Sequence, residues 1–167
     1  MKRLILTRHA KSSWDDPATP DHDRPLNDRG RAAAAELGVW LASRGYIPGE
    51  VLCSDAMRTR LTWDGLAPAL PGTPTVHLKS ALYHAGPDVM LAVLRHAAEE
   101  CVMMIGHNPG IAEFAARIVA RPPLHAEFHR YPTGATLVCD FIADTWAEVG
   151  YGMGTTEDFI IPREVAA

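Results

Sequence analysis

The alternation of short apolar runs with helical patterns constrains the fold of this 167-residue chain more than any other feature of its sequence. Short apolar runs, each typical of a buried strand, occupy residues 4–6, 51–53, 76–78 and 102–105. Apolar positions recur at helical spacing over residues 28–44, where Gly45 ends the pattern. This alternation predicts an α/β fold, a three-layer sandwich whose mostly parallel central sheet has helices on both faces.

Three further helices are expected. One begins near Asp55 and another at Pro87. A third follows Asn108, which the pattern places at the N-cap, with Pro109 at the first helical position.

The C-terminal part of the chain has a different pattern. Residues 135–142 are strand-like, residues 143–144 could form a turn and residues 145–149 alternate in polarity. This predicts an antiparallel hairpin at or near a sheet edge. No repeat, linker or low-complexity stretch divides the sequence, so one domain over residues 1–167 is expected.

Composition and charge argue against several classes of function. The net charge of −4 does not provide the excess of positive charge that is typical of proteins that bind nucleic acid or an anionic membrane. No apolar run approaches the ~20 residues needed to span a bilayer, and the N-terminus lacks a signal-peptide pattern. The three cysteines, Cys53, Cys101 and Cys139, have no metal-site spacing and are expected to be buried, reduced thiols. We therefore expect a cytoplasmic protein with neither a nucleic-acid nor a membrane partner.

Histidine and arginine side chains follow three of the predicted strands. Arg8 and His9 end the first strand, Arg58 lies just after the second, and His107 follows the strand at residues 102–105. If these strands are parallel, their carboxyl ends meet at one edge of the sheet, where ligands of open α/β sheets bind.

These residue types suit a phosphoryl group. Guanidinium groups offer fixed forks of donors for phosphate oxygens, and a histidine ring nitrogen can accept phosphoryl covalently. Each residue alone has an ordinary structural explanation, such as a solvated arginine in a first helical turn. Their coincidence at three strand ends favours a phosphoryl site, in which positive side chains could do much of what a metal does elsewhere.

The motifs resemble those of the histidine phosphatase superfamily, also called the phosphoglycerate mutase-like superfamily. The matching segments cover nearly the whole chain and are residues 8–9, 24–27, 54–58 and 106–108, with Gly30. The short length and the Arg-His-Ala-Lys-Ser form of residues 8–12 are most similar to the SixA-type phosphohistidine phosphatases.

The resemblance implies a role for each matched residue. His9 would be the nucleophile, and Arg8, Arg58 and His107 would hold the phosphoryl oxygens until water hydrolyses the intermediate. No metal or organic cofactor is expected. The implied partner is a phosphohistidine-bearing protein or a small phosphorylated molecule.

Other residues near these motifs are secondary candidates for phosphate or substrate binding. They are Lys11, Ser12, Arg24 and His84. Larger members of the superfamily place an acid in the segment after the third strand, where this chain has His84. That histidine could donate a proton or could be an ordinary surface residue. Many members also have glycine where this chain has Ala10.

Competing functions remain open from the sequence. A small-molecule phosphomonoester phosphatase of the same superfamily is one, and a non-catalytic phosphate-binding or phosphorelay module is another. A phosphomutase should need a longer chain to enclose its substrate. A metal site built from His9, His84 and His107 lacks helical ligand spacing and has arginines beside it. The short chain offers no insertion for a lid, so an open, shallow pocket is expected.

Overall fold

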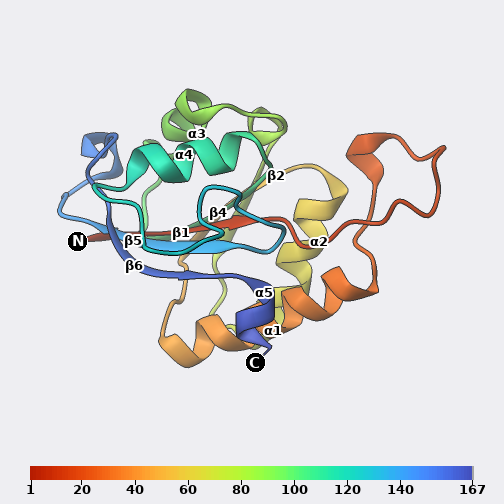
Figure 1. Ribbon diagram of the computed structural model, residues 1–167. Coiled ribbons are helices and arrows are strands. Elements are labelled where there is room, and N and C mark those ends of the chain that lie inside the picture. The colour runs from red at the N-terminus through yellow and green to blue at the C-terminus, as the bar shows by residue number, and fades with distance from the viewer. Residues whose placement is uncertain (167) are drawn as a thin grey trace.

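The computed structural model describes residues 1–166, which form a six-stranded mixed sheet with helices on both faces (Figure 1). The strands are β1 (Lys2–Arg8), β2 (Glu50–Ser54), β3 (Thr75–Lys79), β4 (Cys101–Gly106), β5 (Thr136–Phe141) and β6 (Thr155–Ile160). Their order across the sheet is β3-β2-β4-β1-β5-β6. The first four strands are parallel to one another, and β5 and β6 add to the sheet antiparallel. The predicted α/β architecture is confirmed.

Helices cover the two faces of the sheet in pairs. The helices are α1 (Asp28–Arg44), α2 (Met57–Leu66), α3 (Pro87–Leu94), α4 (Gly110–Ile118) and the short α5 (Pro162–Val165). Ile5 of β1 packs in the cluster shared with α1 and α2, whereas Leu4 and Leu6 pack in the larger cluster shared with α3 and α4. Because side chains alternate along a strand, β1 is buried on both faces, which explains its unbroken apolar run.

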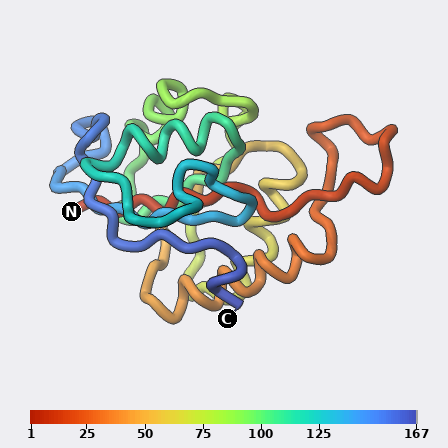
Figure 2. Tube along the Cα trace, in the orientation of Figure 1, coloured from red at the N-terminus to blue at the C-terminus, as the bar shows by residue number. Residues whose placement is uncertain are grey.

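Local capping explains the bounds of α1. The Asn27 side chain accepts a hydrogen bond from the Gly30 amide at the N-terminus, and Gly45 ends the helix in the left-handed conformation with φ of 73°. The predicted range 28–44 is therefore confirmed. Figure 2 shows the segment between β1 and α1 extending outward before it returns to this helix.

The predicted N-cap of α4 is wrong. The helix begins at Gly110, with Pro109 at the N-cap. The Asn108 side chain is engaged elsewhere, since its amide nitrogen donates to the carbonyl oxygens of Arg130 (2.9 Å) and Tyr131 (3.1 Å). Asn108 therefore ties the β4–α4 junction to the loop before β5.

The predicted hairpin strand at residues 145–149 is also wrong. That segment contains a 3-10 helix, η4 (Trp146–Glu148), and the antiparallel partner of β5 is the later strand β6. Trp146 and Val149, three residues apart, are both buried, and the Trp146 indole donates to the Glu99 carbonyl oxygen at 2.6 Å. This burial at intervals of three fits a 3-10 turn better than a strand.

Two further sequence expectations concern the cysteines and membrane segments. Cys53 and Cys139 are buried, Cys101 is partly buried, and all three are free thiols. Across residues 1–166, no helix combines the length and apolar character that crossing a membrane requires.

Candidate active site

The register of the parallel strands brings two histidines together. Arg8 at the end of β1 pairs with Gly106 at the end of β4, so His9 and His107 leave neighbouring strands at the same level. Their ring centroids are 5.3 Å apart. Backbone pairing in the sheet therefore brings both imidazoles close together without requiring any side-chain contact.

A cavity of about 250 Å³ lies at this edge of the sheet. Its lining residues are Arg8, His9, Lys11, Ser12, Trp14, Arg24, Arg58, His107, Asn108 and Thr133. The structure thus brings all but one of the candidate residues predicted from the sequence to a single cavity. The exception is His84, whose side chain is 63% exposed and whose ring centroid is 6.3 Å from that of His107.

The tautomer of His9 follows from its hydrogen bond. Its Nδ1 lies 2.7 Å from the Ala10 carbonyl oxygen, which can only accept, so Nδ1 carries the proton. Nε2 is left with a free lone pair. Burial, together with the nearby arginine charges, lowers the pKa of His9 to about 3, so the ring is neutral at pH 7. His9 is prepared to act as a nucleophile.

His107 has the opposite arrangement. Its Nε2 lies 2.8 Å from the Ser54 hydroxyl, which itself accepts from the Ala56 amide at 3.3 Å. The Ser54 hydroxyl can donate its proton to Nε2, and in that tautomer the ring proton is on Nδ1. That nitrogen is buried and has no hydrogen-bond partner among the described residues. Burial, with the charge of His9 next, lowers the pKa of His107 to about 3.

The arginines also present donors without partners. Arg8 Nη1 donates to the Tyr131 carbonyl oxygen at 3.2 Å, and Arg58 Nη1 donates to the Asp21 carbonyl oxygen at 2.8 Å. These contacts fix the two guanidinium groups. In the described part of the chain, Nε of Arg8 and Nε of Arg58 are buried and have no acceptor. Burial lowers the pKa of Arg8, and the charge of Arg58 adds to this effect.

The segment between β1 and α1 forms another wall of the cavity. Arg24 Nη1 donates to the Ser12 hydroxyl at 2.8 Å, and its guanidinium stacks 3.6 Å from the ring centroid of Trp14. Trp14 is 75% exposed, so it lies at the mouth of the cavity rather than inside it. Trp14 and Thr133 belong to no motif or periodic pattern, so the sequence did not indicate them as site residues.

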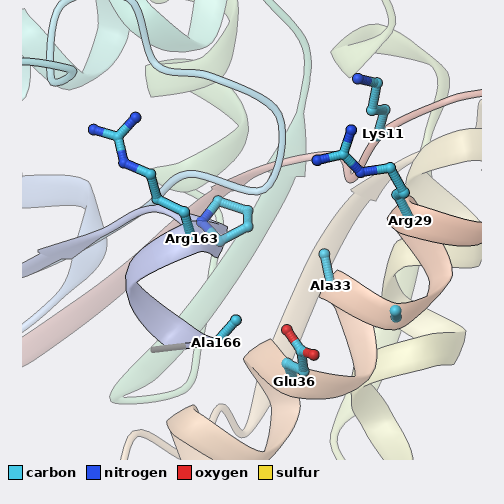
Figure 3. A pocket seen from close by; sticks show the side chains of 8 residues that line it. Lys11, Arg29, Ala33, Glu36, Arg163 and Ala166 are labelled. Carbon is cyan, nitrogen blue, oxygen red and sulfur yellow. The ribbon is translucent and has the colours of Figure 1, made fainter.

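A second, shallow cavity of about 310 Å³ adjoins the first and shares Lys11 with it. Figure 3 shows Lys11 and Arg29 together on one side of this cavity, with Arg163 of α5 on the other. Glu36 of α1 also lines it. Positive side chains therefore continue from the histidine site along the surface between α1 and α5.

Chemically, the first cavity can hold a tetrahedral anion beside a neutral imidazole. Arg8, Arg58 and His107 line it, each with one buried nitrogen that has no hydrogen-bond partner among the described residues, and no residue of its lining is acidic. Among residues 1–166, no group of three or more histidine, cysteine, aspartate or glutamate side chains is arranged to hold a metal ion.

A family model and related proteins agree with this arrangement. Residues 4–83 match the model described as the histidine phosphatase superfamily (branch 1). An uncharacterized protein of Mycobacterium tuberculosis is 32% identical over 163 residues, which cover 93% of this chain and 99% of that protein. An uncharacterized chloroplastic protein of Arabidopsis thaliana is 38% identical over 128 residues, which cover 70% of this chain but only 59% of the plant protein.

A solved structure extends the comparison to the whole fold. It is a crystal structure from Agrobacterium tumefaciens assigned as a phosphohistidine phosphatase SixA. The two structures superpose with a TM-score of 0.82 and 29% sequence identity, over 96% of this chain and 98% of the other.

Proposed function

Since this chain belongs to the histidine phosphatase superfamily and to its SixA-type branch, we propose that it is a metal-independent phosphohydrolase that forms a phosphohistidine intermediate on His9. Arg8, Arg58 and His107 hold the phosphoryl oxygens, and Lys11, Ser12 and Arg24 extend the positive wall. The phosphoryl donor is a phosphohistidine side chain of another protein.

One observation carries this proposal. Three buried nitrogens, Arg8 Nε, Arg58 Nε and His107 Nδ1, have no hydrogen-bond partner among the described residues, and all three residues line the cavity with the free Nε2 of His9. A buried donor without an acceptor costs roughly 1–3 kcal/mol. Such groups persist where a ligand satisfies them, and a phosphoryl group has enough acceptor oxygens for all three.

The first chemical step follows from the tautomer of His9. The Nε2 lone pair attacks phosphorus, a new N–P bond forms, and the bond from phosphorus to the donor breaks with its electron pair going to the donor nitrogen. The His9 ring becomes an imidazolium whose Nδ1–H still donates to the Ala10 carbonyl oxygen. This hydrogen bond strengthens as the ring gains charge, which stabilises the intermediate.

Two features support a phosphohistidine donor. No acidic residue lines the cavity to protonate an alkoxide, whereas a donor imidazole with its other nitrogen protonated leaves as a neutral ring. In addition, the adjoining cavity places Arg29 and Arg163 beside the site, where they can contact acidic residues around the phosphorylated side chain of a protein.

Steady-state hydrolysis tests the proposal. Phosphoramidate, a phosphohistidine-bearing protein and an aryl phosphate are each offered to the wild type and to His9→Ala. We expect turnover of the two P–N substrates to exceed that of the ester, and all turnover to disappear in the variant. Turnover of esters alone would favour a small-molecule phosphatase, and binding without any turnover would favour a phosphate-binding or phosphorelay module.

A further inference from the structure

The carboxylate of Asp21 lies against the arginines of the cavity. It belongs to the 3-10 helix η1 (Asp21–Asp23) in the segment between β1 and α1. Its Oδ2 is 3.1 Å from Arg58 Nη2, and its Oδ1 is 3.2 Å from Arg24 Nε. Within residues 1–166, it is the one carboxylate that forms an ion pair with any arginine lining the histidine cavity.

Several contacts fix this carboxylate in place. The Tyr83 hydroxyl donates to Oδ2, and the Asp21 backbone oxygen accepts from Arg58 Nη1. The neighbouring His22 reaches Asp55 at 2.9 Å, which attaches η1 to the segment before α2. The Asp21 side chain is nevertheless 45% exposed, so solvent water can reach it.

Asp21 is ionised in the free protein. The Tyr83 hydrogen bond, followed by the charge of Arg58, holds the pKa of this carboxyl well below its usual value. A group that stays ionised cannot supply a proton to a leaving group at neutral pH. It can accept one, and it can orient a water molecule through a hydrogen bond.

The stereochemistry of phosphoryl transfer restricts where that water must lie. The attacking and leaving atoms are roughly in line, so water approaches phosphorus on the side opposite His9 Nε2. Arg58 is shared, because its Nε is free for a phosphoryl oxygen while Nη1 and Nη2 hold Asp21. One guanidinium thus connects the Asp21 carboxylate, which is outside the lining of the cavity, to the cavity that would hold the phosphoryl group.

We propose that Asp21 is the proton acceptor for the water that hydrolyses the phosphohistidine intermediate, an inference that rests on the proposed function of His9. The water oxygen forms a bond to phosphorus as the bond from phosphorus to His9 Nε2 breaks. The electron pair of that bond returns to Nε2, so His9 becomes a neutral imidazole again. The water proton passes to Asp21, which then releases it to solvent as inorganic phosphate leaves.

Rapid-quench kinetics with phosphoramidate separate the two chemical steps. In Asp21→Asn we expect phosphorylation of His9 at nearly the wild-type rate, with steady-state turnover about 100-fold slower. The phosphorylated enzyme should accumulate to near one equivalent, measured by intact mass under alkaline quench. Added formate should speed dephosphorylation of Asp21→Ala, because it restores a carboxylate that a purely structural role would not need.

Asp23→Asn is the matched control. Asp23 is in the same 3-10 helix and is 63% exposed, but its one ion pair among the described residues is with His22 at 3.6 Å. This variant should hydrolyse phosphoramidate like the wild type. Thermal unfolding of each variant checks that the fold is retained.

Two results would overturn the role of Asp21. Equal loss of both chemical steps, without accumulation or formate rescue, would mean that Asp21 only positions Arg58. Faster turnover in Asp21→Asn would mean that the carboxylate competes with the phosphoryl group. Neither result would affect the proposed function, which fails separately if the wild type never carries phosphate on His9.

Discussion

At the residue scale, the two buried imidazoles differ in which ring nitrogen forms a hydrogen bond with a neighbouring oxygen atom. Nδ1 of His9 is hydrogen-bonded to the Ala10 carbonyl oxygen, and Nε2 of His107 is hydrogen-bonded to the Ser54 hydroxyl. His9 is therefore left with a lone pair on Nε2, and a proton donated by Ser54 would leave His107 with an N–H group at Nδ1. Neighbouring oxygens, rather than the histidines themselves, would set the tautomers that the proposed roles of nucleophile and donor require.

Replacing Ser54 tests this division. In Ser54→Ala, Nε2 of His107 loses its partner and the other tautomer becomes accessible, which removes the N–H group from the cavity. We expect kcat/KM for phosphoramidate to fall about 5-fold, since one hydrogen bond contributes roughly 1 kcal/mol. Ser43→Ala, on the exposed surface of α1, is the matched control. Unchanged kinetics in Ser54→Ala would show that the serine does not set the tautomer.

His9 and His107 are buried in their neutral forms, which makes the stability of the fold depend on pH. Their pKa values are about 3 in the folded chain, against an ordinary value of 6.5. Between these values the unfolded chain binds more protons, so the free energy of unfolding falls as the pH drops below 6.5. Each imidazole should lower the free energy of unfolding by about 1 kcal/mol for each pH unit below 6.5.

Urea unfolding at pH 7 and pH 5 measures this loss of stability. The double variant His9→Gln, His107→Gln should have a much flatter pH dependence, whatever its absolute stability. An equal loss in the wild type and the double variant would assign the effect to other groups.

At the element scale, strand ends were predictable and loop geometry was not. Periodicity and the apolar runs predicted β1, β2, β4 and α1, and parallel register then placed His9 and His107 side by side. Local signals failed where tertiary contacts decide the structure. Asn108 has the chemistry of an N-cap, but its amide is engaged by the loop before β5.

The position of Asp21 shows the same limit for the candidate site. Its carboxylate reaches Arg58 and Tyr83, which are 37 and 62 residues away in the sequence. No spacing rule connects these three residues, because the intervening elements return the chain to the same place only in the folded structure. The sequence predicted most of the residues that line the histidine cavity and did not indicate this carboxylate.

Close packing of α1 on the segment after β1 gives a stability prediction. A Cβ atom at Gly30 would lie 2.0 Å from the Lys11 carbonyl oxygen, so one of the two backbones would have to move. Gly30→Ala should therefore lower the free energy of unfolding by about 3 kcal/mol. Gly86→Ala, where a Cβ would meet nothing within 4 Å, should change it by less than about 0.5 kcal/mol. Similar urea midpoints for both variants would contradict this packing.

At the scale of the whole molecule, a chain of net charge −4 gathers cations along one part of its surface. Lys11 joins the histidine cavity to the neighbouring cavity of Arg29 and Arg163 (Figure 3). A small substrate would use only the first cavity, whereas a protein substrate would extend over both. Charge in the second cavity should therefore affect protein substrates selectively.

Charge reversal tests that selectivity. Arg29→Glu with Arg163→Glu should lower kcat/KM about 10-fold for an acidic phosphohistidine protein and leave phosphoramidate hydrolysis unchanged. Arg121→Glu, at a cavity elsewhere on the surface, is the control. Equal losses on both substrates, or no loss on either, would contradict a role for this surface in docking.

Trapping the covalent intermediate tests the proposed mechanism without relying on any single contact. Wild type and His9→Ala are mixed with phosphoramidate, quenched in alkali within one turnover, and mapped by mass spectrometry. We predict a phosphoryl group on His9 in the wild type, formed at least as fast as turnover, and none in the variant. Turnover by the wild type without phosphate on His9, or equal turnover by His9→Ala, would rule out His9 as the nucleophile.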